Sequence, residues 1–159
     1  YNHVDTLENM RAANRVLEPQ FPKQIHDDTL EVLSKLTLHG IVAGVVTSTN
    51  TEFAVADLTR LQVPQDAFLF VQGAEVTSHH KPDGRVFNPA LLRLEGLGIK
   101  RSEVLYVGDA LMDYQAAIDA SIQFVGVATG FVSFEQFKEV GAAAISRLGD
   151  LPAYIGVTR

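Results

Sequence analysis

The segment from Val104 to Asp113 constrains the fold of this chain more than any other. Four consecutive apolar residues, Val104 to Val107, lead into Gly108, and the carboxylates Asp109 and Asp113 follow four residues apart. An unbroken apolar run that is rich in β-branched and aromatic residues is typical of a parallel strand covered on both faces. Gly108 permits a tight turn, and Asp109 then lies where open α/β sheets bind their ligands. The segment therefore predicts a buried strand, a polar turn and a helix over 113–120.

The two carboxylates of this segment have two interpretations. Asp109 and Asp113 repel each other unless a cation or a basic side chain lies between them, and their hard oxygens suit Mg²⁺. Alternatively, one aspartate caps the helix and the other favours the helix dipole from the first turn. The ten residues alone leave both interpretations open.

Composition narrows the class of protein. The chain has 159 residues, of which 47% are hydrophobic and 20% charged, so one domain with a hydrophobic core is expected. The net charge is −6 and the 13 lysines and arginines are scattered, which argues against a nucleic-acid partner. Cysteine is absent, which excludes disulfides and Cys-ligated metal, and no apolar run is long enough to cross a bilayer. We therefore expect a cytoplasmic protein with no membrane partner.

Apolar patterns of helical and strand type alternate along the chain, which predicts an α/β fold with a doubly wound parallel sheet. A first helix is expected over 4–17, followed by a break at Pro19 and Pro22. A second helix starts at Asp27 or Asp28 and ends at Gly40, with Leu30, Leu33 and Leu36 as its apolar stripe. The expected strands are 41–46, 67–71, 104–107, 122–128 and 142–145, and the later helices are 51–61, 87–97, 113–120 and 133–140.

Three polar segments follow or flank these strands. Thr47 and Ser48 end the strand 41–46, Asp109 ends the strand 104–107, and Lys81 lies in the polar loop 73–85. If the sheet is parallel, all three meet at one edge. A hydroxyl, an ammonium and a carboxylate pair are the groups that a phosphate monoester with Mg²⁺ requires. The alternative to a phosphate site is that Thr47 merely ends a strand and that Lys81 is a solvated lysine of the loop.

These three motifs, in this order, resemble the haloacid dehalogenase superfamily, in particular its phosphoglycolate-phosphatase-like members. The strand that ends in Thr or Ser is Gly44 to Ser48, the lysine motif starts at Lys81-Pro82, and the acidic motif is Gly108-Asp109 with Asp113. The resemblance covers about residues 21–155. It implies that Thr47, Ser48 and Lys81 bind phosphate, that Thr47 and Lys81 assist catalysis, that Asp109 and Asp113 hold Mg²⁺, and that the substrate is a small phosphorylated metabolite.

The chain departs from the family pattern in three places. The family usually has a second proline where Gly84 stands and a glycine near Ser121. More importantly, family members begin with a strand that ends in Asp-x-Asp, whose first aspartate attacks phosphorus, and no apolar strand of this chain ends in that motif. Asp27-Asp28 precedes a helix, and Asp5 lies within an expected one. By resemblance, residues 1–20 are a remnant of the helical cap and 21–159 are the core domain.

The absent motif leads to the functional expectation. We expect the full-length parent to be a Mg²⁺-dependent phosphohydrolase and this chain, without the nucleophile, to be nearly inactive. The family's first strand lies between the strands that end at Thr47 and Asp109, so its absence predicts either a gap or direct pairing of those two strands. Exposed strand edges would favour self-association. The alternatives are a non-catalytic binding or assembly domain of the same fold and, third, dehalogenase or phosphonatase chemistry.

Overall fold

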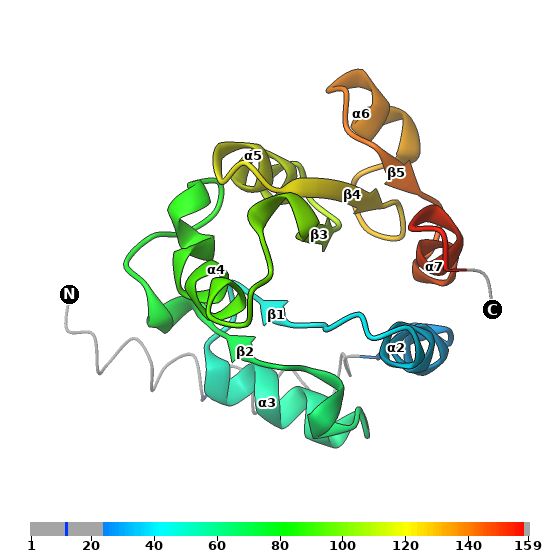
Figure 1. The fold of residues 1–159 in the computed structure, drawn as a ribbon. Helices are drawn as coiled ribbons and strands as arrows, with labels where there is room; N and C mark the ends of the chain where they lie inside the picture. The colour runs from blue at the N-terminus through cyan, green and yellow to red at the C-terminus, as the bar shows by residue number, and fades with distance from the viewer. Residues whose placement is uncertain (1–11, 13–23, 158–159) are drawn as a thin grey trace.

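The computed structural model of the chain describes residue 12 and residues 24–157. The expected helix 4–17, and with it the proposed cap remnant 1–20, lies outside the described residues except for residue 12. In the part that the structure describes, helices and short parallel strands alternate as the sequence predicts (Figure 1). No described helix is long and apolar enough to cross a membrane. The helices are α2 (Thr29–Leu38), α3 (Thr51–Arg60), α4 (Asn88–Glu95), α5 (Leu111–Asp119), α6 (Phe134–Glu139) and α7 (Leu151–Tyr154).

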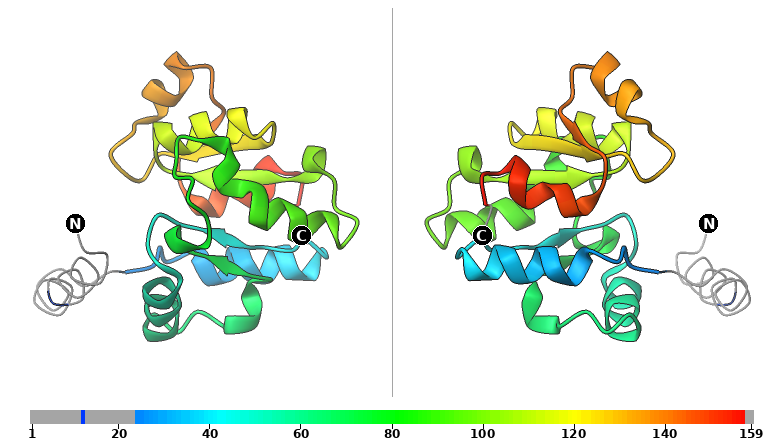
Figure 2. Two further views of the ribbon diagram at one scale, coloured as in Figure 1. Left: turned by 90° about the vertical axis from the view of Figure 1, so that its left-hand side faces the viewer. Right: turned by 90° about the vertical axis from the view of Figure 1, so that its right-hand side faces the viewer.

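The strands form two separate parallel sheets. The strand β1 (Val45–Val46) pairs with β2 (Val71–Gln72), with Val45 opposite Val71. The second sheet has the order β3-β4-β5, built from β3 (Leu105–Gly108), β4 (Gln123–Val127) and β5 (Ala144–Ile145). Figure 2 shows the separation from two sides: β1 and β2 lie with α3 in the lower half, and β3, β4 and α5 lie in the upper half.

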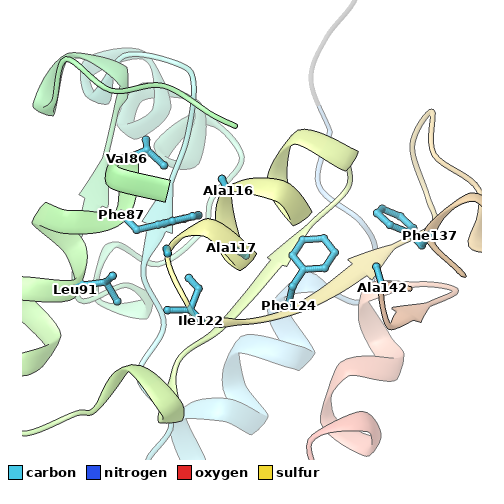
Figure 3. Close-up of a cluster of buried hydrophobic side chains, with 10 residues drawn as sticks. Val86, Phe87, Leu91, Ala116, Ala117, Ile122, Phe124, Phe137 and Ala142 are labelled. Carbon is cyan, nitrogen blue, oxygen red and sulfur yellow. The ribbon is translucent and has the colours of Figure 1, made fainter. Parts of the chain in front are cut away.

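Helices cover both faces of the three-stranded sheet, which gives the doubly wound arrangement. On one face, α2 and α7 place Val32, Leu36 and Leu151 against Val125 and Ile145. On the other face, α4, α5 and α6 contribute to a second cluster around β4 (Figure 3). This second cluster contains Val86, Phe87, Leu91, Ala116, Ala117, Ala120, Ile122, Phe124, Phe137 and Ala142. Its alanines on α5 are fully buried, so the helix lies close to the sheet.

The element types agree with the sequence patterns, whereas several boundaries differ. The strands expected over 41–46 and 142–145 are reduced to two residues each, and the strand expected over 67–71 is found at 71–72. The pairing of β1 and β2 nevertheless continues beyond the strands, because the Leu69 N–H donates to Ala43 O at 2.8 Å. The helix expected over 113–120 starts two residues earlier, at Leu111. On α2, Val32 and Leu36 are buried, but Leu30 is 44% exposed, so the predicted stripe is wrong at Leu30.

A groove separates the two sheets. Of the two outcomes expected from a missing strand, the structure therefore has the gap: β1 and β3 belong to different sheets. The groove has a volume of about 900 Å³. We call it the inter-sheet groove; residues 42–44, Val46 and Phe70 line its β1 side, and residues 104–107 line its β3 side.

Candidate active site

A buried ion pair stands at the carboxyl ends of β1 and β3. The Lys81 Nζ lies 2.8 Å from the Asp113 Oδ1, and each side chain is only 8% exposed. Lys81 comes from the loop after β2, and Asp113 comes from the first turn of α5. A pair this well shielded from water interacts much more strongly than a surface pair. The structure thus brings together two of the predicted site residues.

Tyr106 connects this ion pair to β1. Its hydroxyl accepts a hydrogen bond from Lys81 Nζ at 2.5 Å and donates one to Val46 O at 3.1 Å. The same oxygen lies 3.5 Å from Asp113 Oδ1. Burial, followed by the negative charge of Asp113, raises the pKa of the Tyr106 phenol well above its ordinary value. Tyr106 therefore stays protonated at neutral pH and remains a hydrogen-bond donor.

The strand end of β1 meets the same cluster. The Lys81 Nζ donates to Val46 O at 3.3 Å, and Thr47 follows Val46 directly. The Thr47 Oγ1 accepts the N–H of Thr49 at 3.1 Å, which leaves its own hydroxyl proton for another acceptor. Ser48 is exposed beside it. The hydroxyls and the ammonium thus lie at one edge, as the parallel arrangement predicts.

Asp109 differs from Asp113 in its surroundings. Asp109 is exposed at the end of β3, whereas Asp113 is buried, and its second carboxylate oxygen accepts the Ala110 N–H at 3.2 Å. The N-cap residue of α5 is Ala110, so Asp109 does not cap the helix. Asp113 pairs with the basic side chain of Lys81, and it also lies in the first turn of α5, where an acid favours the helix dipole. It therefore fits part of both interpretations given by the sequence.

The donor set at this edge fits a Mg²⁺ ion that is held mostly by non-protein oxygens. Among the described residues, no three histidine, cysteine or acidic side chains gather as a ready metal cage. Mg²⁺ commonly uses one or two carboxylates and completes its shell with water and substrate phosphate oxygens. The exposed Asp109 carboxylate suits that mode, while the Asp113 carboxylate is already engaged by Lys81.

Two glycines make room for the site. A Cβ on Gly108 would lie 2.6 Å from the Asp113 Cβ, so only glycine lets Asp113 approach the end of β3.

Gly84 donates its N–H to the Asp119 Oδ2 at 2.7 Å, and a Cβ there would lie 2.4 Å from the Ala120 N. A proline at position 84 has no N–H to donate. The departure from the usual second proline is therefore matched by a contact to α5 that proline could not make.

Several polar side chains near the site stabilise local structure. Asn50 occupies the N-cap position of α3 but makes no side-chain cap bond, and Glu75 instead accepts the Thr51 N–H at 3.1 Å. That hydrogen bond lowers the pKa of Glu75. Asp83 pairs with Arg85 at 2.6 Å and lies 3.5 Å from the His79 Nδ1. Both carboxylates therefore have partners close to them in the sequence or in space.

Sequence reasoning missed two residues near the site. The sequence pattern indicates only an apolar strand residue at Tyr106, although its hydroxyl contacts Lys81 and Val46. Gln72, at the end of β2, is buried and donates from its Nε2 to Val86 O at 2.7 Å. It thereby fixes the segment that follows Lys81. For Tyr106, the only sequence feature that points to a role at the site is its polar hydroxyl within an otherwise apolar strand. For Gln72, the sequence contains no such feature.

Comparison with known proteins decides the family. A model of the haloacid dehalogenase-like hydrolase family matches residues 5–127. The chain belongs to this family. A protein named pyrophosphatase PpaX from Caldanaerobacter subterraneus subsp. tengcongensis is 34% identical over 133 residues, which cover 84% of this chain and 58% of that protein. An N-acetylmuramic acid 6-phosphate phosphatase from Pseudomonas aeruginosa is 33% identical over 107 residues, covering 67% of this chain and 46% of that protein.

Solved structures of hydrolases show the same fold. One from Bacteroides fragilis is 30% identical with a TM-score of 0.71, and the match covers 95% of this chain and 72% of that chain. A hydrolase from Pseudomonas syringae has a TM-score of 0.75 at 22% identity, and the match covers 93% of this chain and 67% of that chain. The chain thus spans about half the length of the curated relatives it matches.

Proposed function

We propose that this chain supplies the phosphate-binding part of a Mg²⁺-dependent phosphohydrolase that acts on a small phosphorylated metabolite. The observation that carries the proposal is the buried Lys81–Asp113 pair at the shared carboxyl end of β1 and β3. An ammonium held in a fixed place by a carboxylate can stabilise the charge that develops on a phosphoryl oxygen. The phosphatase names of the relatives support the same reaction class.

Each predicted residue has a role in this proposal. Thr47 and Ser48 donate hydrogen bonds to phosphate oxygens, and Lys81 neutralises their charge. All three ammonium protons of Lys81 already have acceptors, so a phosphate would displace the longest and neutral contact, the one to Val46 O at 3.3 Å. Asp113 and Tyr106 act through Lys81 as positioning residues.

Asp109 would hold the magnesium ion. Bound Mg²⁺ supplies positive charge that neutralises the phosphoryl oxygens of the substrate. Because the exposed Asp109 is one carboxylate, we expect weak Mg²⁺ affinity in this chain alone. The nucleophile would come from an Asp-x-Asp strand in the longer protein, since none of the strands that the structure describes ends in that motif. This chain by itself should therefore hydrolyse phosphomonoesters poorly.

Turnover of a phosphomonoester by the longer protein tests the proposal. Lys81→Ala and Thr47→Ala should each lower turnover by about 10²-fold, the scale of losing one preorganised electrostatic group. Lys138→Ala is the matched control, because Lys138 is an exposed lysine on α6. Unchanged turnover in Lys81→Ala would leave Lys81 as a structural ion-pair partner. No turnover by the longer protein itself would favour the non-catalytic binding or assembly domain. If this chain alone shows robust Mg²⁺-dependent turnover that Asp109→Asn abolishes, the chain contains its own nucleophile, and the expectation of an inactive chain is wrong.

A further inference from the structure

Gln72 contacts both elements that carry the proposed phosphate-binding side chains. Its backbone O accepts the Thr47 N–H at 3.0 Å, at the end of β1. Its side-chain Nε2 donates to Val86 O at 2.7 Å. Val86 belongs to the 3₁₀ turn Gly84–Phe87, which follows the loop that carries Lys81. One residue of β2 therefore joins the strand end of Thr47 to the segment of Lys81.

The side chain of Gln72 lies on the core side of the first sheet. In the parallel pairing of β1 and β2, Gln72 is opposite Val46, and paired residues of neighbouring strands direct their side chains to the same face. Val46 packs against the core cluster that also contains Val86 (Figure 3), and Val46 O accepts a hydrogen bond from Lys81 Nζ. Gln72, which is 5% exposed, is thus buried on the face that Val46 and Val86 share.

The amide of Gln72 is only half satisfied. Val86 O can only accept a hydrogen bond, so the amide must turn its Nε2 toward this oxygen. The Gln72 Oε1 is then buried without a hydrogen-bond partner among the described residues. An unpaired buried amide oxygen lowers stability, and an apolar side chain of similar size avoids that cost. Core packing therefore does not explain a glutamine at this position, whereas a role in holding the Lys81 segment does.

A phosphate bound by Thr47 and Lys81 needs both groups at a fixed spacing. Asp113 and Tyr106 hold the Lys81 ammonium from the β3 side. Gln72 holds the backbone that follows Lys81 from the β2 side, and the same residue accepts the Thr47 N–H. A shift of about 1 Å in a positioned group can cost about 10²-fold in its effect. The bond from Gln72 to the Lys81 segment thus bears on phosphate binding as well as on folding.

We propose that Gln72 is a positioning residue, which sets the spacing between the Thr47 hydroxyl and the Lys81 ammonium through its bonds to β1 and to Val86 O. Gln72 itself touches neither the phosphate nor the metal. This inference rests on the proposed phosphate site and adds to it a residue of β2 that lies outside the three sequence motifs. Loss of the side-chain donor should therefore displace Lys81 while the fold is kept.

Gln72→Met tests the proposal on this whole chain. Methionine has a similar size, lacks the N–H donor and removes the unpaired oxygen, so the urea midpoint should stay close to that of the wild type. The ¹H–¹⁵N signal of the Lys81 ammonium group, assigned by its loss in Lys81→Ala, should shift. Inorganic phosphate in the presence of Mg²⁺, titrated by calorimetry, should bind at least about tenfold more weakly with unchanged stoichiometry.

Gln123→Met is the matched control. Gln123 Nε2 donates to Ser102 O at 2.6 Å, which is the same kind of side-chain bond to a carbonyl, at the start of β4. Because β3 and β4 are parallel, this end lies at the opposite edge of the sheet from Asp109. The Lys81 signal and the phosphate affinity should stay unchanged in this variant. Gln72→Leu removes the same donor with a shorter side chain and replaces Gln72→Met if that variant does not fold.

The two measurements separate a failure of this inference from a failure of the proposed function. A wild-type chain that binds no phosphate contradicts the proposed phosphate site, and the Lys81 signal of Gln72→Met then still tests the position of the ammonium. An unchanged Lys81 signal and phosphate affinity in Gln72→Met overturns the inference. Equal changes in Gln123→Met overturn it as well, because they indicate a general loosening of the fold. Failure of both apolar variants to fold, or a lower stoichiometry at the same affinity, assigns Gln72 to folding alone.

Discussion

Lys81 has three ammonium protons, and each has an acceptor in a different part of the fold: Asp113 after β3, Tyr106 on β3 and Val46 on β1. One residue thus ties two sheets together at the edge where the phosphate is proposed to bind. Tyr106 is the central member of this network, because its hydroxyl contacts Lys81 and Val46 at once. Its ring also lies 4.7 Å from that of Phe87, centroid to centroid, which fixes its orientation.

Tyr106 should make the protein sensitive to alkaline pH. Burial and the charge of Asp113 raise the pKa of Tyr106 above its usual value of 10.0. Below pH 10 both the folded and the unfolded chain keep the phenol proton, whereas above it only the unfolded chain releases the proton. The free energy of unfolding should therefore fall by about 1.4 kcal/mol per pH unit above pH 10 from this group.

Urea unfolding at pH 9, 10 and 11 measures this contribution. In Tyr106→Phe, the free energy of unfolding should fall less steeply above pH 10, because phenylalanine has no phenol proton to release. At neutral pH the same variant should be less stable by about 1 kcal/mol, since the bond to Val46 O is lost. Tyr114→Phe is the control at neutral pH: its hydroxyl donates to Val140 O at 3.2 Å in an exposed position, where water replaces the bond. Parallel pH slopes for wild type and Tyr106→Phe would contradict the assignment.

At the scale of elements, the junction between α5 and β4 contains a strained residue. Ser121 has φ of +56°, in the left-handed region that side chains other than glycine adopt at a cost. The position follows the end of α5 at Asp119 and precedes Ile122, which is buried in the core. The tight exit of the helix therefore requires this conformation. The structure thus gives a physical reason for the glycine that the family usually has near this position.

Ser121→Gly should stabilise the protein by about 0.5 to 1 kcal/mol, because the relief of backbone strain exceeds the added entropy of the unfolded chain. Ser102→Gly is the matched control. Ser102 lies in a 3₁₀ turn, residues Arg101–Glu103, and is not among the residues with positive φ. Glycine there should be neutral or destabilising. Denaturant midpoints measure both changes, and an equal shift in the two variants would argue against strain at Ser121.

At the scale of the whole molecule, residues far apart in sequence hold the layers together. Asp28, at the start of α2, accepts the Gly149 N–H at 2.6 Å across 121 positions of sequence. A Cβ on Gly149 would lie 2.5 Å from the same carboxylate oxygen, so glycine permits the contact. The bond joins α2 to the turn before α7, on the face of the sheet that these two helices share.

Asp28→Ala should lower the free energy of unfolding by about 1 to 2 kcal/mol, because it leaves the Gly149 N–H without its acceptor. Asp27→Ala is a close control, since Asp27 is the exposed neighbour of Asp28 and lies at the same helix end. Its effect should stay within about 0.5 kcal/mol. Urea unfolding of the three proteins checks the prediction. Equal losses in both variants would assign the effect to charge at the start of α2 instead of the bond to Gly149.

The sequence by itself determined the order and type of the described helices and strands as far as β5, because hydrophobic periodicity reports which residues are buried. The short helix α7 was not among the expected elements. It also indicated the converging edge of Lys81 and Asp113, since parallel strands bring their carboxyl ends together. Strand lengths were overestimated for β1 and β2, because an apolar run marks burial and not the extent of pairing.

Only the tertiary structure decided between a gap and a direct pairing of β1 and β3. The groove between the two strands is lined by residues from several elements, among them Phe70, Leu91 and Tyr106. The tertiary structure likewise revealed the hydroxyl of Tyr106 at Lys81 and the Asp28 bond to Gly149. These contacts join residues separated by 25 and 121 positions. Local sequence patterns contain no information about such distances, because packing of the whole chain sets them.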